Sequence, residues 1–142
     1  MGATMRQDVV DLRDFYATRL GQVARRMIRR RVRELWPHTA GMRFLGIGYA
    51  TPYLRPFRDG AERVAAVMPA SQGVLHWPAV GSGLACLADE EELPFEDATF
   101  DRIIMVHALE TSEQVRGLLR EAWRVMAANG RLLAVVPNRR GI

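Results

Sequence analysis

The chain has 142 residues, of which 49% are hydrophobic and 25% charged, so we expect one domain with a substantial core and not a disordered chain. It contains no apolar run of the roughly 20 residues that a membrane span needs, and its charged first 20 residues argue against a secretory signal. These features predict a cytoplasmic protein. One cysteine excludes an internal disulfide, and three scattered histidines offer no ligand spacing, so we expect no structural metal.

The net charge of +4 belongs to the N-terminal segment, residues 1–37. Residues 1–36 hold nine arginines and four acids, whereas the rest holds eleven arginines and twelve acids. Within the segment, apolar residues recur at mostly three- and four-residue steps: Val9, Leu12, Tyr16, Leu20, Val23, Met27, Val32 and Leu35. This spacing predicts an amphipathic helix, broken near Gly21 and ended by Pro37. We expect its apolar stripe to dock on the sheet or on a partner and its arginines to lie in solvent.

Five short apolar segments follow and alternate with helical stretches: 42–47, 63–68, 83–88, 102–107 and 131–136. They are apolar at successive positions, as strands buried on both faces of a sheet are. Such strands between helices are typical of a parallel sheet covered by helices. We therefore predict an α/β, Rossmann-like, doubly wound domain with a largely parallel sheet of about five strands, preceded by the N-terminal helix.

Residues 44–57, FLGIGYATPYLRPF, predict a strand that ends near Ile47, a turn, and a helix that starts near Pro52. Thr51 is suited to cap that helix, and Pro52 is suited to its first turn. The glycine of the turn is Gly48. A strand, a glycine turn and a helix in this order are the usual frame of a small-molecule site in an α/β protein.

The clearest crossover helix is expected from about Ser112 to Met126. Ser112 is a plausible N-cap, and Asn129-Gly130 a plausible C-terminal stop. Its apolar positions form one stripe: Val115, Leu118, Leu119, Ala122, Trp123 and Met126. This spacing predicts one face packed on the sheet.

In a doubly wound sheet, ligands bind beyond the carboxyl ends of the strands. The residues that follow the apolar segments are therefore candidates for a site, and they include Gly48, Met68-Pro69, Asp89 and His107. His107 could face the site as a base, but a packed or capping histidine is the favoured interpretation.

Two blocks resemble class I S-adenosylmethionine-dependent methyltransferases, in particular the methyltransferase type 11 subgroup. LADEEELPFEDATFDRIIMVHALE, residues 87–110, is similar to the family's Asp-x-x-x-Leu-Pro-Phe-x-x-x-x-Phe-Asp segment and fourth strand. LLREAWRVMAANGRLLAVVPN, residues 118–138, is similar to its next helix, turn and fifth strand. The two blocks stand at the family's spacing, whereas the glycine loop alone is a weak signal.

The resemblance implies that S-adenosylmethionine is the cofactor. It implies that Gly48 lets the backbone approach the methionyl part and that Asp89 binds the adenine amino group, with the backbone of Glu90 nearby. Methyl transfer to an unidentified acceptor is the implied activity, and no catalytic residue is assigned. In this interpretation residues 42–142 are the cofactor-binding core of a single domain, residues 1–142, and the C-terminal part of the family fold is absent.

The chain departs from the family pattern at the glycine loop and after the second strand. Gly46 stands in place of an acid, and Ala50 and Pro52 stand in place of glycines. Met68 stands where the family has an acid that binds the ribose, and a thioether is a poor acceptor. We therefore expect weak cofactor binding, because each lost hydrogen bond to a buried polar group costs about 1–3 kcal/mol.

Two alternatives to an enzyme remain open. The first is a non-catalytic, degenerate methyltransferase-fold module that serves protein or nucleic-acid interaction. The second uses the basic helix itself, whose arginines at 25, 26, 29, 30, 31 and 33 could contact nucleic acid or an acidic membrane surface. A solvated helix face is favoured over both contacts, because no aromatic residues interleave the run as single-strand binding requires.

Overall fold

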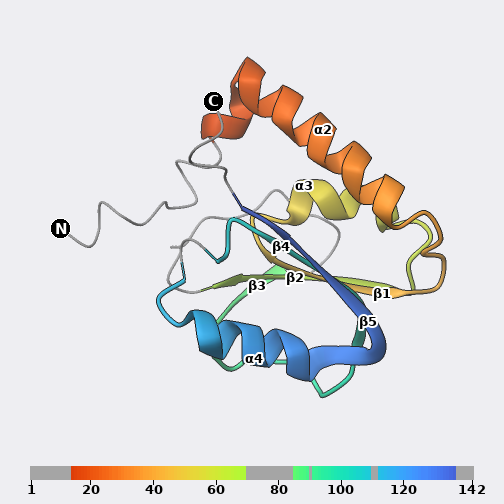
Figure 1. The fold of residues 1–142 in the computed structure, drawn as a ribbon, viewed down its shortest axis with the longest axis vertical. Coiled ribbons are helices and arrows are strands. Elements are labelled where there is room, and N and C mark those ends of the chain that lie inside the picture. The colour runs from red at the N-terminus through yellow and green to blue at the C-terminus, as the bar shows by residue number, and fades with distance from the viewer. Residues whose placement is uncertain (1–13, 70–84, 90, 110–111, 137–142) are drawn as a thin grey trace.

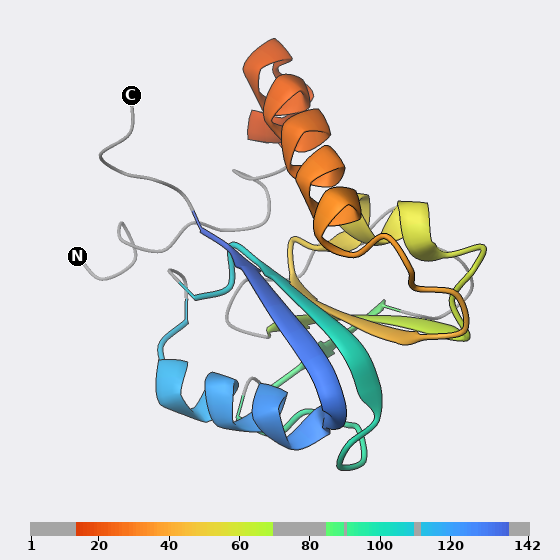
Figure 2. The ribbon, with the colours of Figure 1, turned by 45° about the vertical axis from the view of Figure 1, so that its right-hand side comes forward.

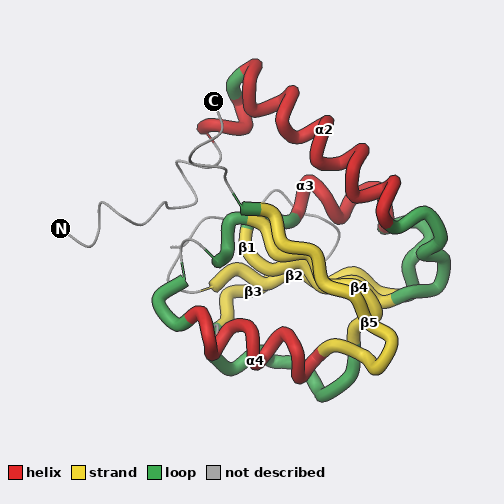
Figure 3. Tube along the Cα trace, viewed as in Figure 1, coloured by secondary structure: helices red, strands yellow, loops and turns green. Residues whose placement is uncertain are grey.

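In the computed structural model, which describes residues 14–69, 85–89, 91–109 and 112–136, five strands form one parallel sheet in the order β3-β2-β1-β4-β5. The strands are β1 (Arg43–Gly48), β2 (Arg63–Pro69), β3 (Ala85–Ala88), β4 (Phe100–Val106) and β5 (Met126–Val135). The order reverses between β1 and β4, as in a doubly wound fold (Figures 1 and 3). The predicted fold class is confirmed.

Helices cover both faces of this sheet. On one face lie α2 (Arg19–Leu35), α3 (Thr51–Leu54) and the 3-10 turn η2 (Arg55–Phe57), and on the other lies α4 (Val115–Val125) (Figures 1 and 2). The strands alternate between two cores: Phe44 packs on the α2 side, whereas its neighbour Leu45 packs on the α4 side. Burial on both faces explains why the strands are apolar throughout.

The N-terminal helix is interrupted at Thr18, three residues before the predicted break. The Thr18 hydroxyl accepts a hydrogen bond from the Gly21 amide at 3.0 Å and so caps α2. Gly21 is inside the helix and buried, and a Cβ there would overlap the backbone carbonyl of Phe15. The predicted break near Gly21 is therefore confirmed, and the glycine lies in the first turn after it, where its missing side chain lets the Phe15 carbonyl approach.

The predicted docking of the apolar stripe of α2 on the sheet is confirmed for part of the stripe. Val32 is buried against the sheet and Ile28 packs beside it, but Leu20 and Met27 remain 70% and 67% exposed. The docked face also contains a cation, since half-buried Arg29 donates to the carbonyl of Pro52 at 2.9 Å. The helix thus has a second, uncovered apolar side.

The predicted strand, turn and helix at residues 44–57 are confirmed. β1 ends at Gly48, and α3 begins at Thr51 with Pro52 in its first turn. The predicted cap is wrong: Ala50 occupies the N-cap position, Thr51 is already helical, and no side chain caps the helix.

The crossover helix is shorter than predicted at both ends. α4 begins at Val115, because the Ser112 hydroxyl accepts from the Gln114 amide at 3.1 Å in a turn that precedes the helix. It ends at Val125, and β5 follows directly at Met126. Asn129-Gly130 is therefore not a helix stop and lies within β5, where the register with β4 is irregular. No helix among the described residues has the length and apolar character that crossing a bilayer requires.

Candidate functional site

The carboxyl ends of the parallel strands meet at one edge of the sheet, where a doubly wound fold binds its ligands. Gly48 ends β1 beside Val106, the last residue of β4. Met68 lies near the end of β2, paired with Leu87 of β3, and Asp89 follows β3 directly. The structure therefore brings three of the residues named from the sequence to this edge.

Gly48 is required by the close approach of β1 and β4. Its φ of +85° lies in the left-handed region, and a Cβ there would overlap the carbonyl oxygen of Val106. The amide of the next residue, Tyr49, donates to the same carbonyl at 2.8 Å. Gly48 thus leaves backbone without a side chain at the edge of the sheet.

The position of Gly46 has no room for the acid that it replaces. A Cβ there would stand 2.6 Å from Cδ1 of Leu54 and 2.7 Å from Cβ of Ala50. Leu54 is fully buried, so α3 lies directly against the β1 backbone at this point. An acid at this position would have to displace α3, so the absence of a carboxylate is built into the packing.

Met68 and Asp89 present opposite chemistry at neighbouring strand ends. Met68 is 4% exposed and offers a thioether, which is a weak acceptor. Asp89 is exposed, and its Oδ1 accepts from the Glu91 amide at 2.9 Å. Glu90, which the resemblance placed beside the adenine, lies outside the described residues. Asp89 is therefore the carboxylate available to a ligand where β3 ends.

Arg124 of α4 fixes the loop that runs from Asp89 to β4. Its Nη1 donates to the carbonyl of Phe95 and to Oδ1 of Asp97, each at 2.8 Å, and its Nη2 donates to the carbonyl of Leu93 at 3.0 Å. Glu121 accepts from Nε and Nη2 of Arg124 at 2.8 and 2.9 Å. One guanidinium therefore ties three loop residues to the helix.

Glu121 completes this network from the other side, since its Oε1 accepts from the Leu93 amide at 2.8 Å. The hydrogen bond from Arg124 lowers the pKa of the Glu121 carboxyl, and the hydrogen bond to Glu121 raises the pKa of Arg124. The pair stays ionised near neutral pH, so the loop stays attached.

Phe100 and Asp101, the Phe-Asp pair that ends the motif, stabilise the loop and the sheet. Phe100 is fully buried and meets Phe95 edge to face, with ring centroids 5.0 Å apart. Asp101 accepts from the Arg43 amide at the start of β1 at 2.9 Å. The motif residues Leu93, Phe95, Phe100 and Asp101 therefore build the loop and the strand that follow Asp89 in the chain.

A chain of buried hydroxyls lies over the ends of β1 and β4. Tyr53 of α3 donates to the hydroxyl of Tyr16 at 2.8 Å, and that hydroxyl lies 2.9 Å from Nε2 of His107, the residue after β4. The Tyr16 ring stacks on the Tyr49 ring, with centroids 4.9 Å apart and planes 8° apart. The Tyr16 ring thus contacts His107, Tyr49 and Tyr53.

The Tyr53 end of this chain is fully buried. Its hydroxyl donates to Tyr16, whose own hydroxyl is within hydrogen-bond distance of Nε2 of His107. Burial, and next its hydrogen bond to Tyr16, raise the pKa of Tyr53. His107 is buried with a left-handed φ of +55°, as the packed interpretation expects.

The comparison with protein families decides the identity of this fold. A family model described as a methyltransferase domain matches residues 45–134, from β1 into β5. The chain belongs to the methyltransferase domain family. Its match spans the glycine turn, the Asp89 loop and α4 together, so the resemblance noted in the sequence is confirmed.

Relatives of this methyltransferase domain agree with that assignment. The "Putative methyltransferase YrhH" of Bacillus subtilis is 29% identical over 62 residues, which are 44% of this chain and 34% of YrhH. A SAM-dependent methyltransferase of Aquifex aeolicus has the same fold with a TM-score of 0.51 at 18% identity, over 75% of this chain and 62% of that one. The chain thus spans less than two thirds of the length of either protein.

The same fold also occurs in a protein named for a different reaction. The [4+2]-cyclase SpnF superimposes with a TM-score of 0.55 at 24% identity, over 79% of this chain and 44% of that one. At such identities the likeness concerns the fold alone. The reaction of this methyltransferase domain must therefore be argued from its own residues.

Sequence reasoning missed the Tyr16–Tyr53–His107 chain in this methyltransferase domain. Tyr16 was read only as one member of an apolar helical stripe, and Tyr53 was not singled out. Tyr53 and His107 are 37 and 91 positions from Tyr16 in the sequence, so no local spacing could have joined them.

Proposed function

We propose that this methyltransferase domain binds S-adenosylmethionine at the carboxyl edge of its sheet and supports methyl transfer to an acceptor. The observation that carries the proposal is the Asp89 loop. Arg124 and Glu121 tie it to α4 by hydrogen bonds, and it follows β3 at the same edge of the sheet as the glycine turn of β1, with β2 between them. A carboxylate on a fixed loop suits selective recognition of an amine donor such as the adenine amino group.

The fit of this edge to the cofactor is partial. Gly48 allows a ligand to approach bare backbone, and Asp89 supplies an exposed acceptor. Met68 offers no acceptor for ribose hydroxyls, and Gly46 has no space for an acid. Each missing anchor costs about 1–3 kcal/mol, so affinity is lower by about five- to 150-fold for each.

The chain's own residues contribute binding and alignment. S-adenosylmethionine supplies a methyl group activated on a sulfonium, and its transfer needs mainly an in-line approach of the acceptor. Asp89 would orient the adenine end, and the Gly48 turn would set the depth of the methionyl end. The buried aromatic side chains of Tyr16, Tyr49 and Tyr53 would exclude water beside Gly48. We assign no residue to proton transfer.

Binding of S-adenosylmethionine by the parent chain and two variants tests this function. In equilibrium dialysis, Asp89→Ala should weaken binding by about 1–3 kcal/mol, the penalty for leaving a buried amine unpaired. Glu92→Ala is the matched control, because it removes an exposed acid from the same loop. Equal affinity of both variants would contradict the role of Asp89.

A non-catalytic module is the second candidate, and Met68 and Gly46 favour it, because both lack the acceptor that the cofactor needs. This function predicts no saturable binding of S-adenosylmethionine by the parent chain. It also predicts that Met68→Asp, which adds an acceptor after β2, does not create binding.

A further inference from the structure

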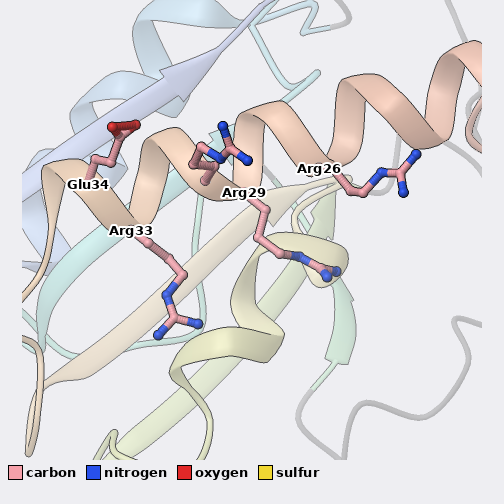
Figure 4. A pocket seen from close by; sticks show the side chains of 5 residues that line it. Arg26, Arg29, Arg33 and Glu34 are labelled. Carbon is pink, nitrogen blue, oxygen red and sulfur yellow. The ribbon is translucent and has the colours of Figure 1, made fainter.

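The outer side of α2 concentrates positive charge. Its 17 residues include seven arginines and one acid, Glu34. Four of these arginines, Arg26, Arg29, Arg30 and Arg33, line an open hollow of about 530 Å³ together with Glu34 (Figure 4). Arg26, Arg30 and Arg33 are exposed, so their charges face solvent.

Arg29, which lines the hollow on the side of α3, lies close to other arginines. Arg29 is tied to the carbonyl of Pro52, and burial, followed by the positive charges of Arg25 and Arg55, lowers its pKa. Like charges gathered in this way repel one another. A negatively charged partner would relieve that repulsion, so the charge pattern favours an anionic surface as the occupant.

An apolar ridge runs beside these arginines. Leu20, Val23 and Met27 follow one another at three- and four-residue steps, so they lie on one side of the helix. All three are exposed, and Leu20 and Met27 keep about two thirds or more of their surface in contact with solvent, at 70% and 67%. Arg26 and Arg30 stand three residues after Val23 and Met27 and therefore border the ridge.

We propose that the outer face of α2, comprising Leu20, Val23, Met27, Arg26 and Arg30, docks on an anionic lipid bilayer. The phosphates of such a bilayer pair with guanidinium groups, and its acyl boundary takes up apolar side chains. Nucleic acid matches only the first feature, because its backbone offers nothing to an apolar ridge. This surface lies on α2 and is independent of the methyl-transfer proposal.

Sedimentation of the full chain with lipid vesicles tests the proposal. One set of vesicles is phosphatidylcholine, and the other contains about 30% phosphatidylglycerol, which gives a negative surface potential. We expect binding to the anionic vesicles only, with a loss of about tenfold or more between about 0.1 M and 0.5 M salt.

Two variants separate the contributions of charge and apolar side chains. Arg26→Glu with Arg30→Glu should reduce vesicle binding by about tenfold or more, and Leu20→Ser with Met27→Ser should reduce it by a similar factor. Arg116→Glu with Arg120→Glu is the control, because it makes the same change of charge on exposed positions of α4. The control should bind as the parent does.

Three results would overturn the proposal. They are equal binding of the parent to neutral and anionic vesicles, an equal loss in the α4 control, and unchanged binding of the Leu20→Ser, Met27→Ser variant. Titration of a labelled DNA duplex distinguishes the nearest rival. Tight, salt-sensitive DNA binding that depends on Arg26 and Arg30, without vesicle binding, would make the surface a nucleic-acid site and the membrane proposal wrong.

Discussion

Replacing Arg124 with methionine should loosen the loop that carries Asp89. Methionine keeps much of the aliphatic volume but removes five hydrogen bonds, which go to Glu121, Asp97 and the carbonyls of Leu93 and Phe95. The bond to exposed Asp97 contributes little. The remaining four, at about 0.5–1 kcal/mol each, give an expected destabilisation of about 2–4 kcal/mol.

Urea unfolding followed by circular dichroism measures this change, and the midpoint of thermal unfolding should fall by about 10 °C. Arg116→Met is the matched control, since Arg116 is exposed on the same helix. The reasoning fails if Arg124→Met and Arg116→Met are equally stable. In that case the hydrogen bonds of Arg124 would merely replace equivalent bonds to water.

Three further changes test the structure. The hydrogen bond from Arg124 lowers the pKa of Glu121, so the Glu121 carboxylate stabilises the fold at pH values above its ordinary pKa, and this contribution is lost as pH falls through the lowered value. Glu121→Gln should therefore reduce the loss of urea stability over this acidic range of pH. Gly48→Ala should destabilise by about 2–4 kcal/mol in the same assay, because of its positive φ and a backbone overlap. Tyr16→Phe should cost about 1–2 kcal/mol in the same assay, because it removes the hydroxyl between Tyr53 and His107.

Controls decide these three cases. An unchanged acid profile for Glu121→Gln would mean that the carboxyl titrates normally in the folded state. Gly60→Ala, at an exposed glycine whose added Cβ would meet only one atom, at 4.0 Å, should be tolerated where Gly48→Ala is not. Parent-like stability of Tyr16→Phe would mean that the hydroxyl chain does not stabilise the fold.

The sheet could be predicted because each of its strands is a short run of successive apolar residues. Residues such as Phe44 and Leu45 are both apolar because each faces a different core. The turn at Gly48 could be predicted for a similar reason, since the apolar run, the glycine and Pro52 all indicate the same boundary. Agreement among independent local signals is what made these predictions correct.

The errors arose where one local signal suits more than one structure. Asn129-Gly130 resembles a helix stop but lies in an irregular part of β5. Ser112 resembles a cap but closes a turn on Gln114. A glycine or serine indicates an irregular backbone or a capped turn, and the fold is needed to show which of these is present.

One part of the candidate site could be predicted from the sequence, and another part could not. Asp89 could be singled out because its motif continues through the packed residues Leu93 and Phe100. The reason for the missing acid at Gly46 could not be predicted, because it depends on where Leu54 packs against β1.

Isothermal titration of the parent chain and of Met68→Asp with S-adenosylmethionine tests the central claim most directly. We predict weak but saturable binding by the parent and an affinity about tenfold higher, or about 1.4 kcal/mol, for Met68→Asp, which restores an acceptor at the end of β2. A circular dichroism spectrum of each sample confirms that the buried aspartate has not unfolded the domain. Saturable heat from neither folded protein would contradict the cofactor site and leave the methyltransferase fold serving as a non-catalytic module.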